Sequence, residues 1–111
     1  MLIYKIMSES DFDIFKKKGV FLGAEVDITD GYIHFSTRDQ VKETAAKHFS
    51  GQNNLYLVWT NSKLFKNNLK WEISRKNQTF PHLYQAWHYK EVVGSCKLPL
   101  ISDQHMFPDK L

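Results

Sequence analysis

The sequence is poor in cysteine and has no long apolar run. One cysteine, Cys96, in 111 residues excludes an internal disulfide and a cysteine cluster for zinc. It stands in an apolar stretch, so we expect a buried, unreactive thiol. No run approaches the roughly 18 consecutive apolar residues of a membrane helix, and no basic segment followed by an apolar core marks a secretory signal. We therefore expect a cytoplasmic protein with no membrane partner.

Composition and length favour one aromatic-rich domain. With 111 residues the chain is expected to form a single domain, with its core over about residues 2–100 and a surface tail at 101–111. Aromatic residues make up 14% of the chain, which suggests an aromatic-lined groove. The net charge of +3 is compatible with a phosphate-bearing ligand but is weaker than the basic stripe of a nucleic-acid-binding protein. Nucleic acid is therefore a weakly supported partner, and no pattern indicates an oligomeric state.

The most informative stretch is residues 30–37, which read DGYIHFST. Asp30 and the following glycine form a turn signal, and the next residues are strand formers. Strand alternation places Tyr32 and His34 on one face. Thr37 and Gln40 have the spacing of a helix-capping box, so we expect a helix from about residue 38 to 49.

His34 is thus expected near a strand end, just before the start of a helix. Free backbone N–H groups and the helix dipole make such a junction an anion site, which Ser36, Thr37 and Gln40 would line. The alternative is a half-buried strand histidine that is bonded to a neighbour.

A second group of polar residues follows a predicted strand over residues 69–74. Arg75 would be a fork-shaped phosphate donor, His82 a second donor or a proton carrier, and Tyr84 a stacking ring. Glu72 would be an acid. The alternative is that Glu72 and Arg75 form a surface ion pair of little consequence.

The remaining pattern predicts an α+β fold. We expect two main helices, of which the first is capped by Ser8 and stopped by Gly19, on a curved, mainly antiparallel sheet of about five to seven strands. Residues 21–23 could form a short extended piece, and residues 24–30, with three carboxylates, are expected to be a polar loop rather than a cation site.

The sequence marks of several common sites are missing. His34 and His82 supply two metal ligands where a catalytic zinc site needs three, so no metal is expected. No nucleophile elbow, P-loop or dinucleotide glycine fingerprint is present.

Six segments together resemble a known family. The chain is similar, over about residues 2–100, to the bacterial family called domain of unknown function 952, through Ile3–Ile6, Asp30–Thr37, Gln40 with Thr44, His48–Gln52, Leu69–Glu72 and Phe80–Tyr84. That family's fold is similar to the fold of the ADP-ribosyltransferases and the RNA 2'-phosphotransferases, which use NAD. The resemblance implies a split, mainly antiparallel sheet with a cleft between its halves.

The resemblance also implies an NAD- or nucleotide-phosphate-binding enzyme related to those transferases. His34 would hold a ribose hydroxyl or a phosphate, Arg75 would neutralise charge and His82 would serve as acid, base or donor. The other expected ligand contacts are Ser36 and Thr37 at phosphate, Gln40 beside them, and Tyr32 or Tyr84 at a ring. The alternative is a binding module that kept the cleft without the chemistry, because Glu72 does not align with the transferases' catalytic glutamate.

One consequence is geometric. If residues 30–37 and 71–84 build one site, the side chains of His34 and His82 must lie within about 10 Å of each other, as convergent groups in a concave site require. Arg75 or Tyr84 should lie on the same wall, with the Thr37 helix start opening onto the pocket.

Overall fold

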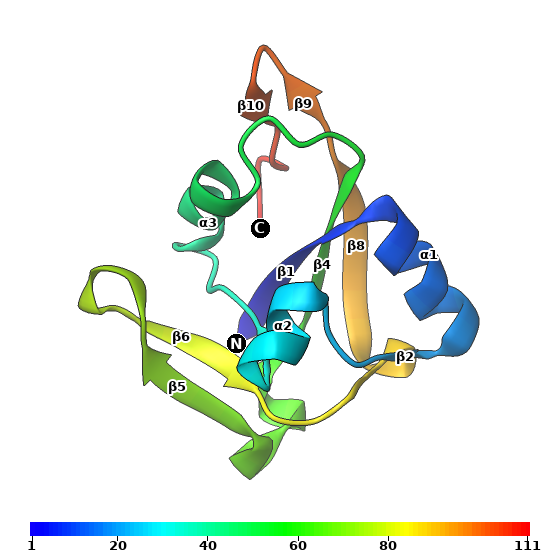
Figure 1. Ribbon diagram of the computed structural model, residues 1–111, viewed down its shortest axis with the longest axis vertical. Coiled ribbons are helices and arrows are strands. Elements are labelled where there is room, and N and C mark those ends of the chain that lie inside the picture. Colours follow the sequence, from blue (N-terminus) through cyan, green and yellow to red (C-terminus); the bar gives the residue numbers. More distant parts are fainter.

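The computed structural model describes all 111 residues as a mixed α+β structure with three helices and several antiparallel sheets (Figure 1). The helices are α1 (Glu9–Lys18), α2 (Glu25–Asp30) and α3 (Val41–His48). The strands are β1 (Leu2–Ser8), β2 (Val20–Phe21), β3 (Ile33–His34), β4 (Leu55–Asn61), β5 (Leu69–Ile73), β6 (Thr79–Leu83), β7 (Trp87–His88), β8 (Val92–Leu98), β9 (Leu100–Ile101) and β10 (Gln104–His105). None of the helices is both long and apolar enough to cross a membrane.

The strands form two three-stranded sheets and two small pairs. The larger sheets have the orders β1-β4-β8 and β3-β6-β5, and β2 pairs with β7 while β9 pairs with β10. All pairings are antiparallel. Tyr4 and Ser36 exchange two backbone hydrogen bonds of 2.8 Å, which join the edge strand β1 to the end of β3. The expected α+β class is confirmed, but the structure has a third helix and ten strands in four sheets instead of one sheet of about five to seven strands.

Two apolar clusters lie on the two faces of the β1-β4-β8 sheet. Because side chains alternate along a strand, Ile3 and Met7 of β1 enter one cluster and Tyr4 and Ile6 enter the other. Helix α1 contributes phenylalanines to the first cluster, and α3 contributes Val41 and Ala45 to the second. The charged residue Lys5 therefore lies within a strand that is buried on both faces.

Helix α1 begins and ends where its sequence predicts. The Ser8 side chain accepts a 3.1 Å hydrogen bond from the backbone N–H of Asp11. Gly19 ends the helix with φ at +76°, a left-handed conformation that glycine adopts without strain.

The prediction of a polar loop over residues 24–30 is wrong, although the short extended piece expected just before it is present as β2. Residues 25–30 form the short helix α2, whose Asp27 side chain accepts a 2.8 Å hydrogen bond from the backbone N–H of Ala24. Gly31 ends α2 with φ at +89°. The segment is helical because the Asp27 carboxylate caps the start of its own helix.

Helix α3 starts later than expected. Residues 38–40 form a turn, and the helix begins at Val41. The backbone N–H of Thr37 donates to Oε1 of Gln40 at 3.0 Å, so only this half of the expected capping box forms. The helix ends at His48, and Gly51 lies in the turn beyond it.

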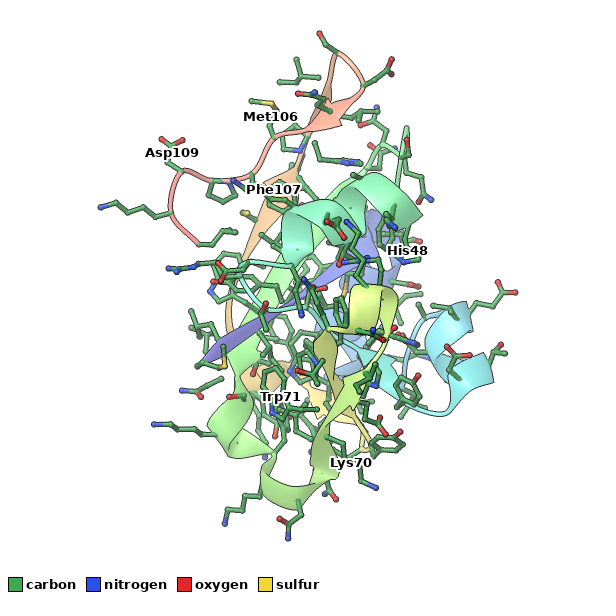
Figure 2. The ribbon with its side chains drawn as sticks, turned by 90° about the vertical axis from the view of Figure 1, so that its left-hand side faces the viewer. His48, Lys70, Trp71, Met106, Phe107 and Asp109 are labelled. Atoms are coloured by element: carbon green, nitrogen blue, oxygen red, sulfur yellow. The ribbon has the colours of Figure 1, made fainter.

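The last residues hold to the surface through a small hairpin and two apolar contacts. After β9 and β10, Phe107 and Leu111 pack against the second apolar cluster. In Figure 2, Phe107 lies over the body of the protein while Asp109 points away from it.

Candidate functional site

A cleft of about 500 Å³ opens between β1, the β3–β6 pair and helix α3. Its walls combine aromatic and aliphatic side chains with hydroxyl, carboxylate, imidazole and cationic groups. The lining residues that carry the following argument are His34, His82, Arg75, Thr44, Ser36 and Asp30.

The two histidines of the site are cross-strand partners. His34 of β3 lies opposite His82 of β6 in the sheet register, and the ring centroids are 5.4 Å apart. This distance confirms the geometric prediction that both would reach one cleft within about 10 Å. Tyr32, just before β3, packs against both rings, with centroid distances of 4.6 Å to His34 and 4.1 Å to His82.

Asp27 of α2 is the buried anchor of this arrangement. Its side chain is fully buried, and Oδ1 lies 2.6 Å from Nδ1 of His34 and accepts a 3.1 Å hydrogen bond from the backbone N–H of His34. Oδ2 lies 3.1 Å from Nζ of Lys5. Burial raises the pKa of Asp27, but the hydrogen bond from the His34 ring, the Lys5 charge and the backbone donors outweigh it and lower the pKa to about 2. Asp27 is therefore a buried carboxylate that fixes the His34 ring.

Lys5 completes a buried charge network. Its Nζ also donates to the backbone carbonyl of His34 at 2.9 Å. Burial lowers the pKa of Lys5, and the neighbouring Asp27 carboxylate opposes that change. Sequence reasoning missed both residues, although a lysine inside an apolar strand is a signal, because buried charges are almost always paired.

His34 has a carboxylate at each ring nitrogen. Nε2 lies 3.0 Å from Oδ2 of Asp30, whose side chain is 42% exposed. The contact of Nδ1 with Asp27 is a hydrogen bond, and that of Nε2 with Asp30 is an ion pair when the ring is protonated. Asp30 is at the cleft, whereas Asp27 is beneath it.

His82 is oriented from behind by Glu72. Its Nδ1 lies 2.9 Å from Oε1 of Glu72, and the Tyr84 hydroxyl donates to the same oxygen at 2.7 Å. Burial lowers the pKa of His82, and the charge of His34 acts in the same direction while Glu72 opposes it. The hydrogen bond to Glu72 raises the pKa of Tyr84 to about 12. The Nε2 atom of His82 has no hydrogen-bond partner in the protein.

Arg75 brings a positive charge to the other part of the cleft. Its Nη2 donates to Oγ1 of Thr44 at 3.1 Å, and Thr44 shares a 2.8 Å hydrogen bond with Ser36. The guanidinium carbon is 4.9 Å from the centroid of the Phe80 ring. Nε lies 3.1 Å from Oε1 of Glu43 but is not aligned for a hydrogen bond, so that contact is an ion pair only. Arg75 is thus held in place with several N–H groups free.

Five of the residues expected at the site do not line the cleft. Gln40 uses its amide to donate to the Thr79 carbonyl at 2.8 Å and to accept from Thr37 at 3.0 Å. The expectation that the helix start opens onto the pocket is therefore corrected. The other residues outside the lining are Thr37, Tyr32, Glu72 and Tyr84. Tyr32 packs against the His82 ring, Glu72 is bonded to His82, and the Tyr84 hydroxyl donates to Glu72.

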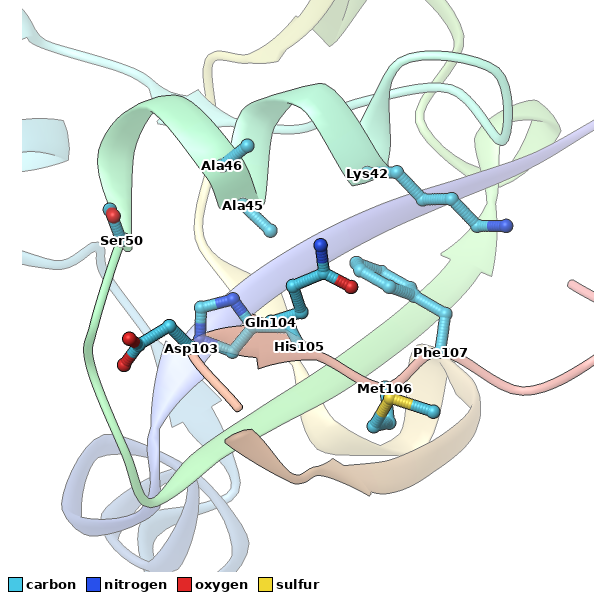
Figure 3. A pocket seen from close by; sticks show the side chains of 9 residues that line it. All are labelled: Lys42, Ala45, Ala46, Ser50, Asp103, Gln104, His105, Met106 and Phe107. Atoms are coloured by element: carbon cyan, nitrogen blue, oxygen red, sulfur yellow. The ribbon is translucent and has the colours of Figure 1, made fainter. Parts of the chain in front are cut away.

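A second pocket, of about 550 Å³, lies between α3 and residues 103–107 (Figure 3). None of the residues predicted for the site lines it. No three His, Cys, Asp or Glu side chains in the structure gather in a way that could hold a metal ion.

Comparison with known proteins gives a family and close structural relatives. Residues 6–95 match the model of a family described as "Protein of unknown function (DUF952)". The crystal structure of protein CC0527 from Caulobacter crescentus is 44% identical, with a TM-score of 0.91 over 95% of this chain and 92% of that one. A solution NMR structure of CC0527 is also 44% identical, with a TM-score of 0.84 over 94% and 90% of the two chains. No significant match to a curated protein was found.

Proposed function

The chain belongs to the family of proteins of unknown function DUF952, and we propose that its cleft binds a nucleotide of the NAD or ADP-ribose type. The observation that carries this proposal is the convergence of His34, His82 and Arg75 on one cleft of about 500 Å³. That volume falls within the range of roughly 300–1,000 Å³ that is usual for small-molecule sites.

Arg75 is the phosphate-binding group in this proposal. The planar guanidinium can bind two phosphate oxygens at once, and only one of its five N–H groups is used by Thr44. The Phe80 ring and Thr44 hold the guanidinium in a fixed orientation, which reduces the entropy lost on binding.

The histidines bind or act on the sugar. His82 presents an Nε2 atom without a protein partner, and Glu72 fixes the ring through Nδ1. A histidine fixed in this way is suited to donate or accept one proton at a hydroxyl or a leaving group. The aromatic walls against which a base or pyridine ring would pack are Tyr4, Phe49 and Phe80, rather than the expected Tyr32 and Tyr84.

The arrangement of the sheets supports a relationship to the ADP-ribosyltransferases. Two three-stranded antiparallel sheets meet at the Tyr4–Ser36 bridge, and the cleft lies beside this junction. This arrangement supports the split sheet that the resemblance implies, and RNA 2'-phosphotransferase-like chemistry belongs to the same proposal. We also propose a cytoplasmic location, because a chain with one cysteine forms no internal disulfide and cytosolic proteins rarely have disulfides.

Calorimetry with NAD, ADP-ribose and 2'-phosphorylated RNA tests the proposal. We expect at least one of them to bind, and Arg75→Lys to weaken binding about ten-fold or more because lysine lacks the fork. Lys76→Gln is the matched control, since Lys76 is the next residue, also pairs with Glu43 and does not line the cleft. No binding of any of the three at millimolar concentration and low salt would refute the proposal.

A second function, binding without catalysis, is favoured by the position of Glu72. Its carboxylate lies behind His82 and is engaged by two side chains, so it does not face the cleft as a catalytic acid would. This reading predicts that Glu72→Gln and His82→Ala leave any measured activity unchanged while a ligand still binds. A turnover signal that either substitution abolishes would exclude it.

A further inference from the structure

The Asp30 carboxylate lies against Nε2 of His34, the only ring nitrogen of His34 that a ligand could reach. Asp27 holds Nδ1 at 2.6 Å from beneath, and Asp30 lies 3.0 Å from Nε2 at the cleft. A ligand that contacts His34 must therefore also contact or displace Asp30. The Asp30 side chain is free to adjust, because it is 42% exposed and α2 ends at this residue.

The pair formed by Asp30 and His34 has the hydrogen-bonding character of a hydroxyl site. The carboxylate accepts hydrogen bonds and the protonated Nε2 donates one, while a hydroxyl group does both. A carboxylate that accepts from a ribose hydroxyl is also how many nucleotide sites select an unmodified ribose.

A phosphate group does not fit the same position. Its oxygens only accept hydrogen bonds, and its charge would lie beside Asp30, with the buried Asp27 carboxylate on the far side of the His34 ring. Two cationic side chains, Lys5 and Arg75, line the cleft. Lys5 is paired with the buried Asp27, whereas Arg75, in the turn between β5 and β6, is paired only with Glu43, which lies outside the lining. The cleft thus has an anion-accepting part and an anion-excluding part.

We propose that Asp30 is a specificity-determining residue that accepts a ribose hydroxyl and excludes ligands phosphorylated on that ribose. This inference rests on the proposed nucleotide binding and specifies its substrate class. The ligand carries phosphate for Arg75 at one end and an unmodified ribose for Asp30 and His34 at the other. ADP-ribose-type nucleotides satisfy this requirement, and a nucleotide that carries a phosphate on the ribose that meets Asp30 does not.

Ligands with a single ribose test the proposal most clearly, because only that ribose can lie beside Asp30. Calorimetry would compare ADP with its forms that carry an additional phosphate on the 2' or the 3' hydroxyl. We expect the unchanged protein to bind ADP at least ten-fold more tightly than one or both of these forms. Asp30→Asn keeps the size of the side chain and removes its charge, so it should reduce that ratio to less than three-fold.

The matched control is Asp39→Asn, which removes an equal charge from a side chain that is 90% exposed and outside the cleft lining. It should leave the ratio unchanged. Equal affinity of the unchanged protein for all three ligands, or a ratio that Asp30→Asn does not alter, would overturn the role of Asp30 while leaving nucleotide binding intact. Failure to bind ADP would overturn it as well, and binding of ADP-ribose would then show whether the proposed function survives.

Discussion

Replacing Asp27 by asparagine should destabilise the protein more than any other single removal of a carboxylate charge. The fully buried Asp27 side chain interacts with Lys5 and with both the ring and the backbone of His34. Asparagine has nearly the same shape but no charge, so the variant leaves the Lys5 ammonium buried without a counter-ion. The substitution therefore isolates the electrostatic contribution of the network.

The structure allows the size of the effect to be worked out in two ways. The pKa of Asp27 falls from 3.8 to about 2 on folding, which at about 1.4 kcal/mol per pKa unit is a contribution of about 2–3 kcal/mol. Removing one partner of a buried ion pair costs about 3–5 kcal/mol. Because Lys5 keeps the His34 carbonyl as an acceptor, we expect the cost of Asp27→Asn to lie near the lower of these values. We expect a loss of about 2–3 kcal/mol in the free energy of unfolding.

Urea denaturation at pH 7 measures this loss, with Asp39→Asn as the exposed control that should stay within about 0.5 kcal/mol of the unchanged protein. Adding Lys5→Met to Asp27→Asn should recover part of the loss, since it removes the unpaired cation. A loss below 1 kcal/mol for Asp27→Asn, or strictly additive effects in the double variant, would refute the reasoning.

The pH dependence of stability gives a second measurement on Asp27. Its pKa is lower in the folded than in the unfolded chain, so its contribution is complete above about pH 4 and is lost as the pH falls towards 2. The unfolding free energy of Asp27→Asn should fall less steeply over this interval than that of the unchanged protein. Equal slopes would contradict the assignment.

Three further predictions concern other parts of the chain. Gly94→Ala should cost about 1–3 kcal/mol in urea denaturation, because a Cβ atom would lie 2.5 Å from Cζ2 of Trp59; an unchanged midpoint would show that the ring moves freely. Ser8→Ala removes the N-cap of α1 and should cost about 1 kcal/mol, with Ser8→Thr as the conservative control, and equal stability of the two would contradict the cap. Ultraviolet titration should show a phenol that ionises near pH 12, and Tyr84→Phe should remove this ionisation. An ionisation near pH 12 that persists in Glu72→Gln would contradict the role of the Glu72 hydrogen bond.

Local patterns were enough to predict part of the fold. Ser8 and Gly19 mark both ends of α1 because capping depends on residues close in sequence. The alternation that places Tyr32 and His34 on one face follows from strand geometry alone, and their rings are in contact. The start of α3 was misplaced because a turn can carry the same side-chain to backbone hydrogen bond as a helix cap.

The centre of the site was missed because it depends on contacts that are distant in sequence. Asp27 lies 22 positions from Lys5, and α2 has only six residues, too few to show a helical period. The position of Glu72 beside His82 is determined by the pairing of β5 with β6 and cannot be seen within β5 alone. Such relations follow from the tertiary arrangement rather than from any local pattern.

The most direct test of the account follows the imidazole nitrogens by ¹⁵N NMR while ADP-ribose is added. The protein has five histidines, and the account predicts that the ring signals of His34 and His82 shift together along one saturable curve. His88 on β7 and His105, whose Nε2 lies 2.8 Å from the carbonyl oxygen of Gln52, lie outside the cleft lining and should not move. Unchanged His34 and His82 signals at saturating ADP-ribose, or shifts confined to His88 and His105, would contradict the central claim that the paired histidines form a nucleotide-binding cleft.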